Sequence, residues 1–153
     1  MSIRVSIEES YKEAIKSKKL EKANTLRLIK SAIKDKDIEN RTSESSKQIN
    51  DHQILALLQN LIKQRKDSIE SFKIASRNDL IVKEELEIDL ISQFLPKQLN
   101  EKETEEIIKE IIKKQSFSSL KDMGALMNNL KSEYAGSVDI ATAGKIAKLI
   151  LNN

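Results

Sequence analysis

Apolar side chains recur every three or four residues along most of the chain, a spacing typical of amphipathic helices. Residues 51–76 carry the longest such face, with Ile54, Leu57, Leu58, Leu61, Ile62, Ile69 and Phe72. Residues 20–39 carry a broader arc of Thr25, Leu26, Leu28, Ile29, Ala32 and Ile33. Further helices are expected at 3–17, 78–95, 101–114, from 119 to before Gly136, and at 139–151. The pattern predicts an all-α fold.

Polar residues, proline and glycine indicate where several of these helices begin and end. Asn78 is placed to cap the helix that stops at the single proline, Pro96. Two pairs have the spacing of a capping box: Asn100 with Glu103, and Ser119 with Asp122. Gly136 can adopt the left-handed backbone conformation that terminates a helix.

Two breaks in the apolar pattern divide the chain. The stretch at 40–50, NRTSESSKQIN, has no apolar period and is expected to be a mobile linker. The second break follows Pro96. We therefore predict a multi-helical N-terminal subdomain with long antiparallel helices at residues 1–96, and a C-terminal three-helix bundle at residues 97–153.

The composition argues against several classes of protein. Only 3 Gly and 1 Pro leave few residues for the turns of β-sandwiches, barrels or Rossmann folds. With 0 Cys and 1 His, thiol nucleophiles, thiolate metal sites and histidine-based acid–base chemistry have little support. Glu84, Glu85, Glu87 and Asp89 divide between helix faces, which disfavours a magnesium site. We expect no catalytic, cofactor-binding or metal-ligating residues.

The sequence shows no membrane or export segment. No apolar run approaches the roughly 20 residues needed to cross a bilayer. The first residues lack the apolar region of a secretory signal. We expect a cytoplasmic protein without a membrane partner.

The positive charge is concentrated near the N-terminus. The net charge of +3 arises from 27 basic and 24 acidic residues, and the basic excess lies within residues 1–50. Arg27, Lys30 and Lys34 fall within about 60° on a helical wheel, opposite the apolar arc, so all three are expected to face solvent. A second exposed basic row contains Lys63, Lys66 and Arg77. Both rows suit phosphate contacts, and both also suit an ordinary solvated surface.

One charged residue interrupts the longest apolar face. Arg65 lies in the middle of the face of residues 51–76, and Glu84 and Glu87 lie among apolar residues of the next helix. Because an unpaired buried charge costs several kcal/mol, we expect a bidentate ion pair between Arg65 and Glu84 or Glu87. Presentation of Arg65 to a phosphate remains the alternative.

Three segments carry a resemblance to a known family: residues 62–99 (IKQRKDSIESFKIASRNDLIVKEELEIDLISQFLPKQL), 121–131 (KDMGALMNNLK) and 26–39 (LRLIKSAIKDKDIE). The chain resembles the GatB/YqeY family, related to the tail domain of GatB, the tRNA-binding subunit of the glutamine-dependent tRNA amidotransferase. The resemblance implies two helical subdomains without the amidotransferase's catalytic part. It also implies a second RNA contact on the C-terminal bundle, for which Lys131, Lys145 or Lys148 are candidates.

Three functions are compatible with these observations. The resemblance favours a non-catalytic module that binds tRNA or another structured RNA, with tRNA-charging or amidotransferase proteins as further partners. A second hypothesis is a carbon–nitrogen ligase that uses glutamine as amido-nitrogen donor within a tRNA amidotransferase. A third is a protein–protein adaptor whose basic faces only confer solubility.

We predict that the purified chain neither amidates a misacylated tRNA nor hydrolyses ATP. The reason is the absence of cysteine, a glycine-rich phosphate loop and a cluster of metal ligands from the sequence. The measurement is a glutamine-dependent tRNA conversion assay together with a phosphate-release assay. Activity that a single point mutation abolishes would overturn the prediction.

Overall fold

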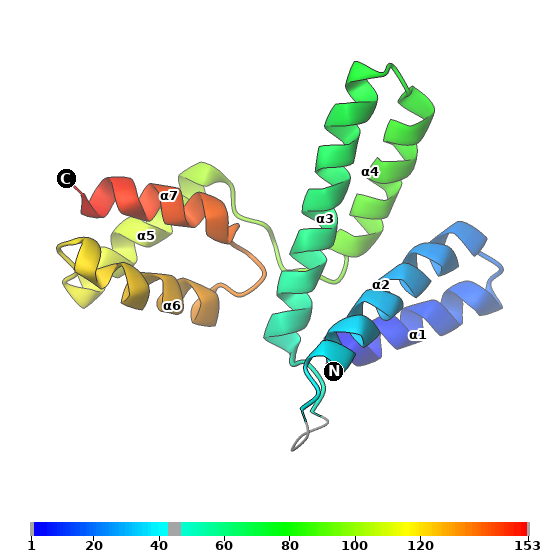
Figure 1. Cartoon of the computed structure of the whole chain (residues 1–153), viewed down its shortest axis with the longest axis horizontal. Helices are drawn as coiled ribbons and strands as arrows, with labels where there is room; N and C mark the ends of the chain where they lie inside the picture. The colour runs from blue at the N-terminus through cyan, green and yellow to red at the C-terminus, as the bar shows by residue number, and fades with distance from the viewer. Residues whose placement is uncertain (1, 43–46, 153) are drawn as a thin grey trace. The chain divides into compact units, whose positions relative to one another are not determined.

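The computed structural model describes residues 2–42 and 47–152, and the regular secondary structure of this part is helical (Figure 1). The elements are α1 (Ile3–Lys16), α2 (Leu20–Glu39), α3 (Asp51–Ile74), α4 (Asn78–Ser92), α5 (Glu101–Gln115), a 3-10 turn η1 (Leu120–Asp122), α6 (Met123–Glu133) and α7 (Ile140–Leu151). The all-α prediction is confirmed. The chain divides into two compact units, Met1–Leu95 and Pro96–Asn153.

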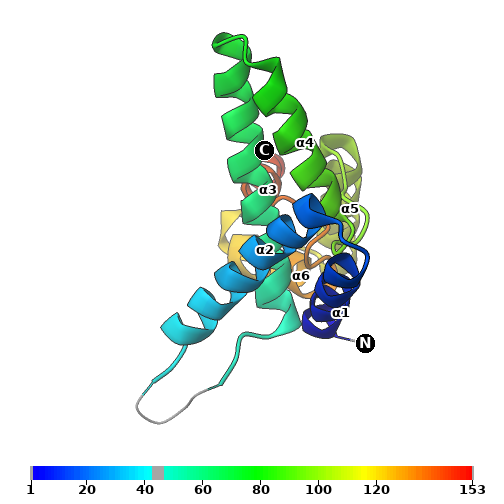
Figure 2. The same ribbon diagram turned by 90° about the vertical axis from the view of Figure 1, so that its right-hand side faces the viewer.

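Two helical hairpins build the first unit. Helix α1 packs against α2, and α3 packs against α4 (Figure 1 and Figure 2). Their shared core consists of Ile7, Ala14, Ala23, Leu26, Ile29, Ile33, Ile49, Ile54, Leu58, Leu90 and Ile91. Leu26, Leu58 and Ile91 are fully buried. Each contributes about 1.5–3 kcal/mol relative to an exposed position.

The second unit is a small bundle of α5, α6 and α7. Its core consists of Ile108, Ile111, Leu126, Leu130, Val138, Ala143, Ala147 and Leu151. Leu120 and Ile140, two apolar residues of this unit, are 44% and 37% exposed. Leu120 belongs to the 3-10 turn η1 and not to α6, so the period of the α-helix does not set its orientation. The Leu99 N–H donates to the Ser137 carbonyl at 2.9 Å, which ties the start of this unit to the α6–α7 connection.

The helix caps agree with the sequence in part. Both expected capping boxes form, Asn100–Glu103 at α5 and Ser119–Asp122 at η1. The prediction for Asn78 is wrong, because Asn78 is the first helical residue and Arg77 occupies the cap without a side-chain bond. Gly136 has a φ of 77°, in the left-handed region, as predicted.

The linker prediction is wrong at its C-terminal end. Ile49 is only 7% exposed and joins the core of the first unit. Asn50 then caps α3 in a capping box with Gln53. The Asn40 amide donates to the Lys47 carbonyl at 3.1 Å, which connects the two ends of the segment. Residues 43–46 lie outside the described part of the chain.

Arg65 forms an ion pair between α3 and α4. Its Nε donates to Glu87 Oε2 at 2.8 Å, and its Nη1 donates to the Leu61 carbonyl at 3.0 Å. The two charged side chains are 13% and 16% exposed. The structure thus brings Arg65 to Glu87 rather than to Glu84, through one nitrogen rather than the expected two.

We predict that Arg65→Met destabilises the fold by about 3–5 kcal/mol, because it leaves the Glu87 charge buried without its partner. Arg65→Met/Glu87→Met should recover most of this loss, since replacing both partners removes the stranded charge. Chemical denaturation measures both effects.

Arg77→Met provides the matched control, because the Arg77–Asp79 pair is 55% and 65% exposed. Its loss should stay below about 1 kcal/mol. Equal losses for Arg65→Met and Arg77→Met would contradict a buried, structural role for the Arg65–Glu87 pair.

Candidate functional site

A basic groove of about 630 Å³ lies between α1 and α2. Four cationic and two carboxylate side chains contribute to its lining, and apolar side chains form the rest together with Ser31. The complete lining is Arg4, Val5, Ile7, Glu8, Arg27, Lys30, Ser31, Ile33, Lys34 and Asp37. We call this feature the α1–α2 groove. It contains all three residues of the N-terminal basic row.

The orientation of α2 determines which of these cations reach solvent. Leu28 is 54% exposed, so the prediction that it lies in the buried arc is wrong. The buried residues Ala23, Leu26, Ile29 and Ile33 move the centre of the packed face towards Lys30. Consequently the basic row lies at the edge of the contact with α1, not opposite the core.

Lys30 is largely engaged in intramolecular contacts. Its Nζ is 2.8 Å from Glu8 Oε2 of α1, and its side chain is 34% exposed. The same Nζ lies 4.2 Å from the ring centroid of Tyr11, a cation–π contact. The hydrogen bond from Lys30 lowers the pKa of Glu8 below its usual value. The prediction that Lys30 faces solvent is therefore wrong.

Arg27 and Lys34 remain exposed on the rim of the groove. The Arg27 Nη atoms donate to Asn24 Oδ1 and to the Tyr11 hydroxyl, both at 3.2 Å. These partners are neutral, so the arginine keeps an unneutralised charge and a defined position. Lys34 has no ion pair within the described residues.

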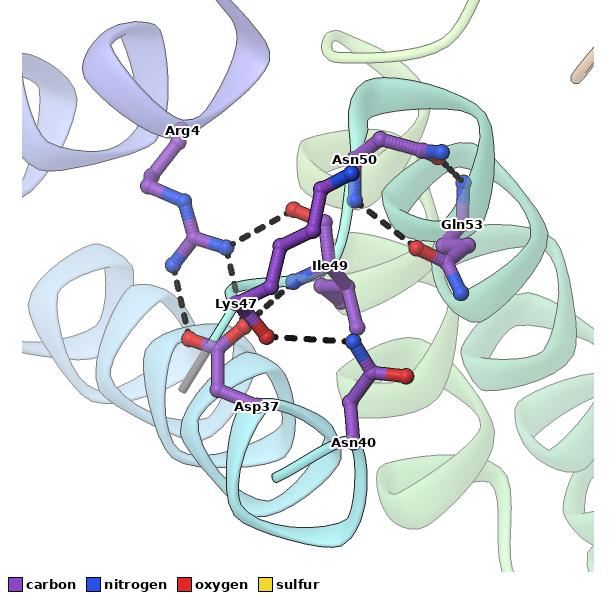
Figure 3. A network of polar contacts seen from close by, with 7 residues as sticks. All are labelled: Arg4, Asp37, Asn40, Lys47, Ile49, Asn50 and Gln53. Atoms are coloured by element: carbon purple, nitrogen blue, oxygen red, sulfur yellow. Dashed lines mark hydrogen bonds and ion pairs between the residues drawn. The ribbon is translucent and has the colours of Figure 1, made fainter. Parts of the chain in front are cut away.

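Arg4 and Asp37, which line the groove, belong to a network of polar contacts around the Asp37 carboxylate (Figure 3). Arg4 Nη1 and Nη2 donate to the two Asp37 carboxylate oxygens at 2.9 and 3.0 Å. The Ile49 N–H donates to Asp37 Oδ1 at 2.9 Å, and Arg4 Nη2 also donates to the Ile49 carbonyl at 3.1 Å. The network joins α1, α2 and the segment that leads into α3.

The electrostatics of Asp37 follow from this geometry. The hydrogen bonds from Arg4 lower the pKa of Asp37, which burial alone would raise, and the Ile49 N–H lowers it further. The sequence pattern did not single out this carboxylate. The available signal was its place four residues after Ile33 and eight after Ile29, both buried on the same helix, where an aspartate requires a partner.

The other predicted contact residues lie outside the α1–α2 groove. Lys63 and Lys66 are exposed on α3, whereas Arg77 is held by Asp79 in two hydrogen bonds of 3.2 and 3.1 Å. In the second unit, Lys131 on α6 and Lys145 and Lys148 on α7 are exposed. Each is sterically available to a phosphate, and Arg77 would first have to leave its carboxylate.

A second groove of about 590 Å³ lies between α2 and α4. It is less basic than the α1–α2 groove, since Lys22 and Lys83 are offset by Glu21, Glu87 and Asp89. Leu28 and Leu86, 54% and 57% exposed, contribute apolar surface to it.

Residues 2–42 and 47–152 contain no group of three or more His, Cys, Asp or Glu side chains placed to hold a metal ion. No helix in this part is long and apolar enough to span a membrane.

A sequence model of the family described as Yqey-like protein matches residues 4–151. The chain belongs to the YqeY-like family. This confirms the resemblance found in the sequence and extends it across both units of the YqeY-like chain.

Several fungal proteins are similar to this YqeY-like chain. It is 26% identical over 153 residues to "Altered inheritance of mitochondria protein 41, mitochondrial" of Vanderwaltozyma polyspora, which covers 94% of this chain and 80% of that protein. The protein of the same name from Lachancea thermotolerans is 34% identical over 90 residues, covering 59% and 46%. An uncharacterised Schizosaccharomyces pombe protein is 34% identical over 96 residues, covering 62% and 73%.

We predict that Asp37→Asn lowers the free energy of unfolding by about 1.5–3 kcal/mol at neutral pH, because a charged acceptor of several hydrogen bonds is lost. The depressed pKa of Asp37 contributes stability above the unfolded-state pKa of about 3.9. That contribution is lost as the pH falls through the lower folded-state pKa. Urea denaturation from pH 7 to pH 3 measures both effects.

Asp35→Asn is the matched control, because Asp35 is an exposed aspartate on the same helix. It should change stability by no more than about 0.5 kcal/mol. A parent and an Asp37→Asn variant with the same stability profile across this pH range would show that the network is dispensable.

Proposed function

We propose that this YqeY-like chain is a non-catalytic module that binds tRNA or another structured RNA through phosphate contacts at the α1–α2 groove. The observation that carries the proposal is the pair of exposed cations on its rim, Arg27 and Lys34, which have no ion pair within the described residues. Phosphate recognition requires charge and reach, and both side chains supply them.

The arrangement of the groove supports this assignment. Lys30 is neutralised by Glu8, and Arg4 by Asp37, so the positive field at the rim comes from Arg27 and Lys34. Arg27 is positioned by Asn24 and Tyr11, which reduces the entropy lost when it contacts a ligand. With a net charge of only +3, we expect affinity on the order of micromolar or weaker at physiological salt.

The resemblance to the GatB tail supports RNA as the polyanion. On the same basis we propose tRNA-charging or amidotransferase proteins as partners, and Lys131, Lys145 or Lys148 as a second contact. The names of the Vanderwaltozyma polyspora and Lachancea thermotolerans relatives contain "mitochondrial", whereas our proposal that this chain acts in the cytoplasm rests on its sequence alone. The carbon–nitrogen ligase and the protein adaptor remain the competing functions.

We predict that Arg27→Gln/Lys34→Gln weakens tRNA binding and reduces the salt dependence of the binding constant. Each lost phosphate contact should lower the slope of log Kobs against log salt by about one unit, so the expected decrease is roughly two. Fluorescence anisotropy titrations across a series of salt concentrations measure the slope, and thermal melting verifies that the variant is folded.

Lys113→Gln/Lys114→Gln removes the same charge from exposed positions on α5 and should bind as the parent does. If both double variants lose binding equally, the interaction depends on net charge and not on the groove. If the parent itself does not bind RNA, the proposed function fails and the adaptor hypothesis takes its place.

A further inference from the structure

The turn between α1 and α2 presents three lysines that the groove does not include. Lys16 ends α1, and Lys18 and Lys19 follow it before α2 begins. All three are exposed, and no ion pair involves them in the part of the chain that the structure describes. Glu13, the nearest carboxylate before them in sequence, accepts a hydrogen bond from Ser17 Oγ at 2.8 Å instead. We call Lys16, Lys18 and Lys19 the turn lysines.

Lys18 occupies a backbone position that favours glycine. Its φ of 58° lies in the left-handed region. The Lys18 N–H donates to the Ile15 carbonyl at 3.2 Å, and the Lys19 N–H donates to the Ala14 carbonyl at 2.9 Å. This is the hydrogen-bond pattern of a Schellman motif, in which the left-handed residue is usually glycine. A lysine here costs stability that glycine would not cost.

The turn lysines continue the basic rim of the α1–α2 groove. Steps of 100° per residue place Lys19, Arg27 and Lys34 within about 80° of one another around α2. A rise of 1.5 Å per residue separates Lys19 from Lys34 by about 22 Å along the helix axis. Arg27 lies between them on the same side. The result is a row of cations along one side of α2, with the turn at one end and the groove at the other.

No aromatic side chain stands free on the surface as a platform for base stacking. All five aromatic residues lie in the described part, and each is half-buried: Tyr11, Phe72, Phe94, Phe117 and Tyr134. Recognition of single strands normally depends on such stacking, which contributes about 1–3 kcal/mol per base. Duplex RNA is instead recognised through shape and through phosphate and 2′-hydroxyl contacts. The helical backbone beneath these cations is already ordered, so the ordering cost of binding a duplex is limited to the side chains.

We propose that the turn lysines form a second phosphate-contact site, and that the RNA element bound along α2 is double-stranded. This inference rests on the proposed function and specifies its ligand. The duplex spans from Arg27 and Lys34 at the groove to the turn. The cationic side chains contact the phosphate backbone of the duplex and do not recognise the base sequence.

The first experiment compares the whole chain with Lys16→Gln/Lys18→Gln/Lys19→Gln in salt titrations with a 20-base-pair RNA duplex. We expect the variant's slope of log Kobs against log salt to fall by about two to three units, close to 0.9 per lost contact. The control Lys102→Gln/Lys113→Gln/Lys114→Gln removes three exposed charges from α5 and should keep the parental slope.

A second variant separates binding from folding. Lys18→Gly removes one charge and relieves the left-handed strain, so it should raise the melting temperature while lowering the slope by about one unit. A single-stranded uridine 20-mer tests the ligand class, and the parent should bind it at least about tenfold more weakly than the duplex.

The outcomes distinguish this inference from the proposed function. If Arg27→Gln/Lys34→Gln weakens binding but the triple turn variant keeps the parental slope, the turn site is rejected and the groove function stands. Equal or tighter binding of the single strand rejects the duplex. If the parent binds neither RNA, the proposed function itself fails.

Discussion

The arrangement of the first unit depends on the buried carboxylate of Asp37. Its oxygens accept from two Arg4 nitrogens on α1 and from the Ile49 N–H, which precedes α3. One side chain on α2 therefore fixes both neighbouring segments. Without it, Arg4 would keep the Ile49 carbonyl as its acceptor among the described residues, and the Ile49 N–H would lose its partner next to the core.

The pairing of cations with carboxylates also defines the candidate binding surface. Arg4 and Lys30, the two cations that lie between the packed helices, form ion pairs with Asp37 and Glu8. Their charges therefore stabilise the fold. Arg27 is oriented by neutral partners, and Lys34 and the turn lysines have no ion partner in the described residues. A ligand on this side of α2 would meet these unneutralised cations, which is why local pairing is more informative than the net charge of +3.

The helix ends show which caps can be predicted from neighbouring residues in the sequence and which cannot. The capping boxes at Asn100 and Ser119 were predictable, because side chains three residues apart satisfy each other's backbone partners without help from the rest of the fold. The left-handed positions of Lys18 and Ser76 were not, because neither residue carries the glycine signal. The prediction that Asn78 caps α4 is wrong for a related reason. Several residues near the start of a helix can serve as its cap, and the packing of α3 against α4 selects among them.

Periodicity in the sequence determined the all-α fold class, and it located the seven α-helices of the described residues to within a few positions, since a 3.6-residue apolar repeat is a local property. It also identified Arg65 as a charge in need of a partner. Only the tertiary structure decided that this partner is Glu87, that Leu28 is exposed, and that Lys30 is bound by Glu8 and Tyr11. The physical reason is that a helical wheel describes one helix alone. Which arc is buried, and which charge is neutralised, depends on the side chains that neighbouring helices bring to it.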